Sequence, residues 1–209
     1  MIESEMGLRE RKKQRTRDAL SAAAIGLFLE RGYDRVSVAE VAAVAEVSKP
    51  TLFKYFASKE DLALHRIADH AGELARVVLG RSSGTSPLAA LHAHFQHGLD
   101  ARDPVTGLND HPQVLAYHRL IFETPALAGR VAAHAAADEE SLAEALGDTP
   151  EPVDLVAAGQ IVTVRRILAR ENWRHLAAGV SAQARYPGAL AAADDAFALL
   201  AGGLSVRYP

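Results

Sequence analysis

The chain has 209 residues, of which 49% are hydrophobic, enough to bury the core of one large domain or of two small ones. It contains no cysteine, which excludes disulfide bonds and thiolate metal sites and is typical of a reducing compartment. The N-terminal residues lack an apolar signal-peptide core and no stretch reaches about 18 apolar residues, so we expect a soluble, cytoplasmic protein without a membrane partner.

Charge is distributed unevenly along the chain, although the formal net charge is only −3. Residues 1–60 carry 11 basic and 9 acidic side chains, whereas the remainder carries 12 basic and 17 acidic ones. All five lysines lie within the first 59 residues. This asymmetry favours an N-terminal part that faces nucleic acid and a body with another role. Chance composition is the alternative.

The first predicted helix covers about residues 16–31, with one apolar face. Gly32 follows it, as is typical where a left-handed residue ends a helix. Six basic side chains precede or begin this helix, and we expect them to contact DNA phosphates or a minor groove: Arg9, Arg11, Lys12, Lys13, Arg15 and Arg17. The alternative is a solvated helix start.

Two helix-start signals follow in close succession within the stretch SVAEVAAVAEVSKPTLFKYFASK. Ser37 and Glu40 form a capping box, in which each side chain bonds to the backbone N–H of the other residue. Ser48 is a second N-cap, with Pro50 in the first helical turn. Each helix is too short to be stable alone, so packing must hold it. Two short helices joined by a tight turn predict a helix-turn-helix.

The second short helix of this motif would enter a DNA major groove with its N-terminal residues at the base edges. Its polar side chains are suited to contacts with bases or phosphates: Lys49, Thr51, Lys54 and Tyr55. Pro50 and the methyl group of Thr51 are suited to contact with a thymine methyl. The alternative is a helical corner in an unrelated all-α protein.

Three segments resemble, in order and spacing, the TetR family of transcriptional regulators: ALSAAAIGLFLERGYD, SVAEVAAVAEVS and SKPTLFKYFASKEDL. The resemblance covers about residues 15–64. It implies an all-α fold with a helix-turn-helix DNA-binding domain in residues 1–60 and a helical effector-binding and dimerisation domain in residues 61–209. It also implies a repressor that binds an inverted-repeat operator in double-stranded DNA as a homodimer and is released by a small-molecule effector.

The resemblance assigns roles to individual positions. Lys49, Pro50, Thr51 and Lys54 match contact positions of the recognition helix, and Ser37, Tyr55 and Lys59 match positions that hold phosphates. We include the capping Ser48 among the DNA-binding residues, while Phe53 and Phe56 match aromatic core positions. Glu46 stands where the family usually has glycine, and a left-handed backbone there would cost about 1 kcal/mol. Either the turn differs or that strain is tolerated.

Further helices are expected at about residues 58–79, 87–99, 112–123, 125–146, 152–178 and 187–204. In the last two, apolar side chains recur at spacings of 3 and 4, which predicts seams for helix–helix packing. We expect these seams to build a four-helix bundle between two protomers through Ile161, Leu168, Leu190, Phe197, Leu200 and Leu204. Core packing inside one chain is the alternative.

The nine histidines include a cluster on one predicted helix, His92, His94 and His97, but sequence spacing does not make their side chains converge. We therefore expect solvated or core histidines, no metal site and no cofactor. No motif for a catalytic nucleophile, a phosphate loop or a zinc protease is present, so we expect no enzyme. The alternatives are a metal- or histidine-dependent helical sensor or enzyme, and a protein-interaction module with a vestigial DNA-binding domain.

An effector pocket is predicted between helices of the body, where ligand sites of helical bundles usually lie. Its expected lining combines apolar and polar side chains: Phe95, Leu99, Tyr117, His118, Ile121, Arg170 and Trp173. A plain core with paired surface arginines is the alternative. The short segments LIFETPAL and VRRILARENW resemble the C-terminal domains of mycofactocin-type TetR regulators, which implies an apolar or acyl-CoA-like effector.

Overall fold

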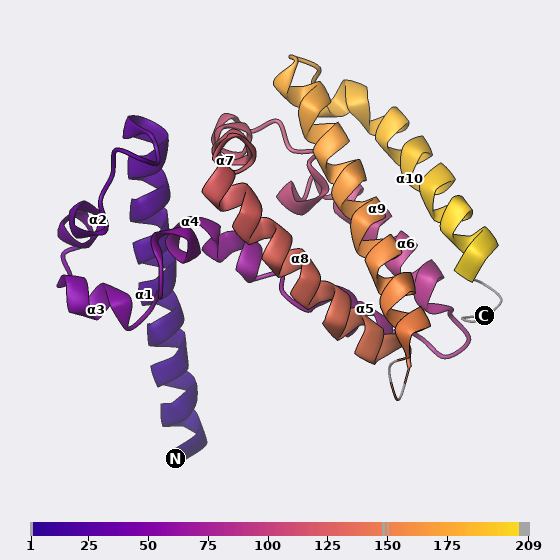
Figure 1. Cartoon of the computed structure of the whole chain (residues 1–209), viewed down its shortest axis with the longest axis horizontal. Coiled ribbons are helices and arrows are strands. Elements are labelled where there is room, and N and C mark those ends of the chain that lie inside the picture. Colours follow the sequence, from indigo (N-terminus) through magenta and orange to yellow (C-terminus); the bar gives the residue numbers. More distant parts are fainter. Residues whose placement is uncertain (1, 148, 150, 205–209) are drawn as a thin grey trace. The chain divides into compact units, whose positions relative to one another are not determined.

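The computed structural model describes residues 2–147, 149 and 151–204, with side chains described from residue 10 to residue 203. Every regular element within this part of the chain is a helix, as the sequence predicted (Figure 1). The elements are α1 (Ile2–Arg31), α2 (Val38–Val44), α3 (Lys49–Phe53), α4 (Lys59–Ala68), α5 (Glu73–Leu79), α6 (Pro87–Asp100), η1 (Pro104–Thr106), α7 (Pro112–Glu123), α8 (Pro125–Leu146), α9 (Pro152–Ala177) and α10 (Ala182–Leu204).

The chain divides into two compact units that are not contiguous in sequence. Unit 1 contains residues up to 69 together with 119–131, and unit 2 contains residues 70–118 and those from 132 onward. The boundary predicted between residues 60 and 61 therefore falls inside α4, all of which belongs to unit 1. Each unit has its own core and is described separately below.

The core of unit 1 forms where α1 packs against α2 and α4. Leu20, Ala24 and Phe28 on α1 are at most 1% exposed, which confirms the predicted apolar face. The helix itself begins at Ile2, well before the predicted start near residue 16. Arg130, near the start of α8, donates to Asp61 Oδ1 on α4 from both Nε (3.2 Å) and Nη2 (3.0 Å), so residues 119–131 are attached to this unit.

One long helix was predicted over residues 58–79, but the structure contains two. Helix α4 ends at Ala68 and α5 begins at Glu73. Gly72 between them has a φ of 66°, which ends the regular helical geometry, and its N–H donates to Asp138 Oδ1 at 2.9 Å. The break depends on an acceptor 66 residues away in sequence, which local patterns do not show.

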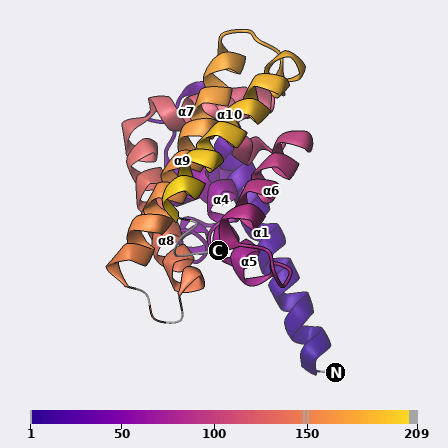
Figure 2. The ribbon, with the colours of Figure 1, turned by 90° about the vertical axis from the view of Figure 1, so that its right-hand side faces the viewer.

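In unit 2, α10 packs against both α9 and α6, and α9 and α10 are neighbours in both views (Figure 1 and Figure 2). Helix α10 begins at Ala182, so the start predicted at residue 187 is wrong and Pro187 lies inside the helix. Ser181 supplies the cap, because its Oγ accepts from the N–H of Ala184 at 3.2 Å. Pro187 is the sixth residue of this helix, beyond the four N-terminal N–H groups that lack intrahelical partners, so the helix lacks one backbone hydrogen bond there.

The predicted dimer seam corresponds to the core of a single chain. Ile161, Phe197 and Leu200 are 2%, 2% and 6% exposed, and Leu168 and Leu190 are half-buried against the same core. A partner helix cannot reach side chains that α6, α9 and α10 already enclose, so for these residues the structure favours packing within one chain. The side chain of Leu204 lies outside the described part.

The connection between α6 and α7 is docked by polar contacts. The side chain of buried Asn172 donates to the carbonyl of Thr106 at 3.0 Å, and Arg185 Nε donates to Asn172 Oδ1 at 3.1 Å. Gly107 follows with a φ of 71°, and a Cβ there would lie 1.9 Å from the carbonyl oxygen of Ala169. The segment thus lies directly on the backbone of α9. Within the described residues, none of the helices has the length and apolarity needed to span a membrane.

Candidate nucleic-acid interface

Helices α2 and α3 form the predicted helix-turn-helix, and serine caps start both of them. Glu40 N–H donates to Ser37 Oγ at 3.2 Å and Ser37 N–H donates to Glu40 Oε2 at 2.8 Å, completing the capping box. The hydrogen bonds that the backbone N–H and the hydroxyl of Ser37 donate to the Glu40 carboxylate lower its pKa. At the start of α3, Ser48 Oγ accepts from the N–H of Thr51 at 3.2 Å. The caps and the burial of Leu52 hold a helix of five residues that would not form alone.

The turn between these helices contains Glu46 with a φ of 54°, in the left-handed region. The sequence left open whether the turn differs or a left-handed backbone is tolerated at this residue, and the structure contains the left-handed backbone. The turn keeps the backbone geometry that glycine favours, while the side chain is exposed. The exposed carboxylate therefore adds a negative charge beside the recognition helix.

The exposed surface of α3 is formed by Lys49, Pro50 and Lys54, as expected for a recognition helix. Phe53 was expected in the core, but it is 45% exposed, and Lys49 Nζ lies 5.9 Å from the centroid of its ring. The helix is so short that only Leu52, with Phe56 just beyond it, faces inward. An exposed aromatic ring beside a lysine is suited to contact with a thymine methyl or a sugar.

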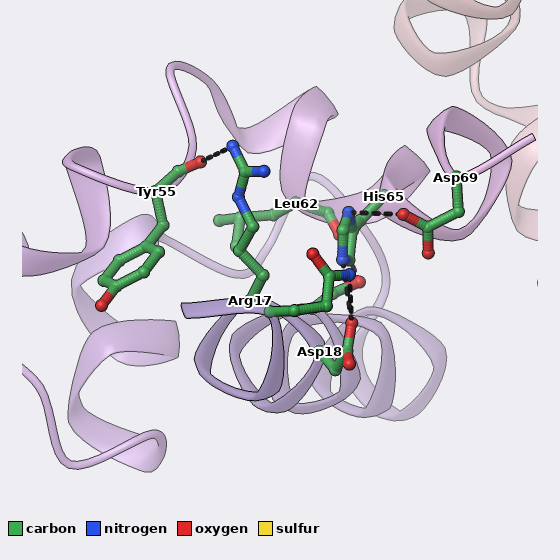
Figure 3. Close-up of polar contacts among 8 residues, drawn as sticks. Arg17, Asp18, Tyr55, Leu62, His65 and Asp69 are labelled. Carbon is green, nitrogen blue, oxygen red and sulfur yellow. Dashed lines mark hydrogen bonds and ion pairs between the residues drawn. The ribbon is translucent and has the colours of Figure 1, made fainter. Parts of the chain in front are cut away.

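Thr51 and Tyr55 are half-buried on the same short segment. Thr51 Oγ1 lies 2.7 Å from Ser48 Oγ, so both hydroxyls are held at the helix start. Arg17 Nη2 on α1 donates to the backbone carbonyl of Tyr55 at 3.4 Å, while the phenol ring extends away from Arg17 (Figure 3). This contact fixes the end of α3 to α1, a role for Arg17 that the sequence did not reveal.

Lys59 has a different environment from the phosphate-binding one that was expected. Its Nζ donates to the carbonyl of Tyr33 at 2.5 Å and lies 4.0 Å from the centroid of the Tyr33 ring and 5.4 Å from that of Phe28. The ammonium group is therefore directed into unit 1. The hydroxyl of Tyr33 in turn donates to Glu60 Oε1 at 2.6 Å. Burial and this hydrogen bond raise the pKa of Tyr33, and the same bond lowers that of Glu60.

The residues predicted to line an effector pocket are distributed over both units. Ile121 belongs to unit 1, whereas the other six belong to unit 2. Within unit 2, Phe95 and Leu99 are core residues at 2% and 0% exposure, and Arg170 is exposed. Burial lowers the pKa of His118 to about 4, so this imidazole is neutral at neutral pH.

Arg165 is the enclosed arginine of α9, and sequence reasoning missed it in favour of Arg170. Its Nε is buried without a hydrogen-bond partner among the described residues, and its guanidinium carbon lies 5.9 Å from the centroid of Phe95. Burial lowers its pKa, while the carboxylates of Glu73 and Asp138 oppose that shift. Both are engaged elsewhere, since Glu73 pairs with two histidines and Asp138 accepts from Gly72 N–H. Arg165 follows buried Ile161 by four residues, so helical periodicity would have placed both side chains on the same face of α9.

Residues 20–65 match the family model of bacterial regulatory proteins of the tetR family. These residues contain the helix-turn-helix and the helices that support it. This part of the chain is a DNA-binding domain of the TetR type. The sequence-based identification is thereby confirmed, and the match ends within α4.

Relatives and solved structures agree with this TetR assignment. The HTH-type transcriptional regulator TcmR of Streptomyces glaucescens is 38% identical over 122 residues, 58% of this chain and 54% of TcmR. The nucleoid occlusion factor SlmA of Pasteurella multocida is 31% identical over 121 residues, 57% of this chain and 59% of SlmA. The chain thus spans about half the length of the curated relatives it matches. NalD of Pseudomonas aeruginosa, a secondary repressor of the MexAB-OprM multidrug efflux pump, has a similar fold, with a TM-score of 0.59 at 16% identity over 88% of this chain and 97% of NalD.

Proposed function

We propose that this TetR-family chain is a cytoplasmic, ligand-responsive transcriptional repressor that binds an inverted-repeat operator as a homodimer. The observation that carries the proposal is α3, whose lysines and N-terminal residues are exposed while its caps and Leu52 fix it to unit 1. A rigidly presented helix with basic side chains at its start has the geometry of a major-groove reader. The curated relative TcmR is itself named as a transcriptional regulator.

The proposed dimer surface consists of exposed apolar side chains on α9 and α10. Leu199 on α10 is 80% exposed, and Val156 and Ile167 on α9 are 57% and 55% exposed. Small residues accompany Leu199 on the outer face of α10, including exposed Gly188 and Ala191, so a partner helix has room to approach closely. Two helices from each protomer would then form a four-helix bundle. This surface replaces the buried seam as our candidate interface.

The proposed effector binds in unit 2, with Arg165 as the polar anchor in place of Arg170. An anionic group on the ligand would supply the hydrogen bonds that its buried Nε lacks among the described residues. An acid or acyl-CoA-like effector, as the C-terminal resemblance implies, has this chemistry. Effector binding would favour a dimer geometry whose recognition helices no longer fit the operator, so operator affinity would fall through differential binding of two states.

Selection of bound fragments from a random DNA pool tests the proposed operator binding. We expect an enriched inverted repeat whose half-sites lie about 34–36 Å apart along the helix axis. If Lys49 and Lys54 each neutralise a phosphate, Lys49→Met and Lys54→Met should each reduce the slope of log K against log[salt] on that operator by about one unit. Thr51→Val should instead change the preferred base at one position of each half-site, by about 1–3 kcal/mol.

Arg166→Met is the matched control, because it also removes one exposed positive charge but from unit 2. It should leave both the salt dependence and the sequence preference unchanged. A pool that is not enriched after selection, or equal losses for all four variants, would contradict the proposed mode of DNA binding. Such a result would favour the alternative of an interaction module with a vestigial DNA-binding domain.

A further inference from the structure

The buried imidazole of His65 lies between two carboxylates in unit 1. Its Nε2 is 3.1 Å from Asp18 Oδ1, and its Nδ1 is 3.7 Å from Asp69 Oδ1. Asp18 lies on α1 and His65 on α4, while Asp69 caps the end of α4, so the cluster connects two helices. Figure 3 shows the ring between the two acids. One ligand atom from each residue lies within 4.8 Å of the other two.

The two ring nitrogens face two carboxylates. A neutral imidazole has one N–H donor and one acceptor nitrogen, so it can donate a hydrogen bond to only one of these carboxylates. The side chain of His65 is 8% exposed, so little water reaches the ring. Asp18 Oδ1 already accepts from Gln14 Nε2 at 3.0 Å, so it does not depend on the ring for a donor.

We propose that His65 Nε2 and Asp18 bind one divalent transition metal ion such as Zn²⁺. Two ligands on the same ion, at about 2.0–2.2 Å from it, lie about 3.0–3.5 Å apart. The Nε2 to Oδ1 distance of 3.1 Å falls within this range. Imidazole nitrogen together with carboxylate oxygen suits Zn²⁺ or Mn²⁺ better than Ca²⁺ or Mg²⁺, which take oxygen ligands.

The neighbouring residues complete the site in different ways. Asp69 Oδ1 faces the other ring nitrogen at 3.7 Å, on the side from which carboxylates orient metal-binding histidines in many proteins. Gln14 precedes Asp18 by one helical turn, and a flip of its amide presents Oε1 to the ion. The Asp18 and Asp69 side chains are 56% and 48% exposed, so water can fill the remaining positions. The ion would fasten α1 to the end of α4.

Zinc titration of the full, chelator-treated chain by calorimetry tests this site, with thermal unfolding as a second readout. We expect about one ion per chain and a Tm that rises with zinc concentration. Asp18→Asn should abolish saturable binding, because it removes a ligand. Asp69→Asn should weaken it by about 10- to 100-fold, because it removes only the residue that positions the ring. Both substitutions change half-exposed side chains, so the fold should remain intact by circular dichroism.

His92→Gln is the matched control, since His92 Nε2 also lies 2.9 Å from a carboxylate, that of Asp194, while no second acid pairs with His92 among the described residues. It should leave zinc binding unchanged. Undiminished binding by the Asp18→Asn variant would overturn the proposal. So would a wild-type Tm that does not rise with zinc concentration. Neither result depends on DNA binding.

Discussion

Burial lowers the pKa of His118 to about 4, whereas a histidine in the unfolded chain has a pKa of about 6.5. Between these values the unfolded chain binds a proton that the folded chain does not. This group therefore leaves the free energy of unfolding unchanged above a pH of about 6.5. As the pH falls from there toward about 4, it lowers the free energy of unfolding progressively. We expect this group to account for about 2–3 kcal/mol of that loss.

The His118→Gln variant should lose less stability than the wild type when urea denaturation at pH 7.5 is compared with that at pH 4.5. His175→Gln is the control, because His175 is 42% exposed and pairs with Glu171 at the surface. It should retain the wild-type pH dependence. If the His118→Gln and wild-type curves remain parallel, His118 is not the neutral buried group described above.

The left-handed backbone of Glu46 leads to a second prediction at a single residue. Glu46→Gly removes a conformational strain of about 1 kcal/mol, partly offset by the greater freedom of glycine in the unfolded chain. We expect a gain in stability of about 0.5 kcal/mol, measured by thermal unfolding. Ala45→Gly is the control: its φ of −84° suits alanine, so the same new residue should lower stability. A loss for both variants would mean that the turn is not strained at Glu46.

Most helix starts that the sequence located carry a local signal, either a capping serine or a proline in the first turn, although the serine cap of α10 was missed. Ser37, Ser48, Ser58 and Ser86 each accept from the N–H three residues on, at the starts of α2, α3, α4 and α6. Where a distant contact sets the boundary, local patterns fail. The helix breaks at Gly72, whose N–H donates to the side chain of Asp138. The sequence around Gly72 does not indicate this distant acceptor.

Exposure was harder to predict than helical structure, and Phe53 and Lys59 illustrate why. Phe53 follows the helical apolar pattern, yet α3 is too short for its inward face to include more than Leu52. Lys59 is charged at a helix start, which suggested phosphate binding, but Tyr33 provides it with a carbonyl and a ring from a loop 26 residues earlier. For Lys59 the deciding neighbour is therefore a tertiary one, whereas for Phe53 the length of the helix decides.

The docking of η1 on α9 leads to a prediction about an element. Gly107→Ala would place a Cβ 1.9 Å from the carbonyl oxygen of Ala169, so the connection must shift off α9. We expect a loss of stability of about 2–4 kcal/mol from overpacking and backbone strain together. Gly84→Ala is the control, because Gly84 also has a positive φ, 82°, but has open space around its Cβ position. It should cost only about 1 kcal/mol, and equal losses would exclude a role for the contact with α9.

For the whole molecule, periodicity revealed apolar stripes on the last two helices but not what covers them. The structure shows that one stripe faces α6 within the chain, whereas Leu199 is exposed and belongs to the dimer surface proposed above. We predict that Leu199→Asp yields a folded monomer by analytical ultracentrifugation, with operator affinity at least ten-fold lower because two linked half-site contacts become independent.

Leu79→Asp is the matched control for that experiment. Leu79 is also an exposed leucine, at 71%, but it lies at the end of α5 and not on α9 or α10. This variant should remain dimeric and bind the operator normally. A dimeric Leu199→Asp protein would place the interface elsewhere on the molecule.

The discontinuous composition of unit 1 has a consequence for recombination among relatives. A hybrid regulator made by exchanging one N-terminal segment, cut at residue 69, would keep residues 119–131 from the other parent. The partner of Asp61 would then be the residue that the other parent has at the position of Arg130. New operator specificities should therefore transfer most readily between chains that match at both positions, or when the two segments are exchanged together.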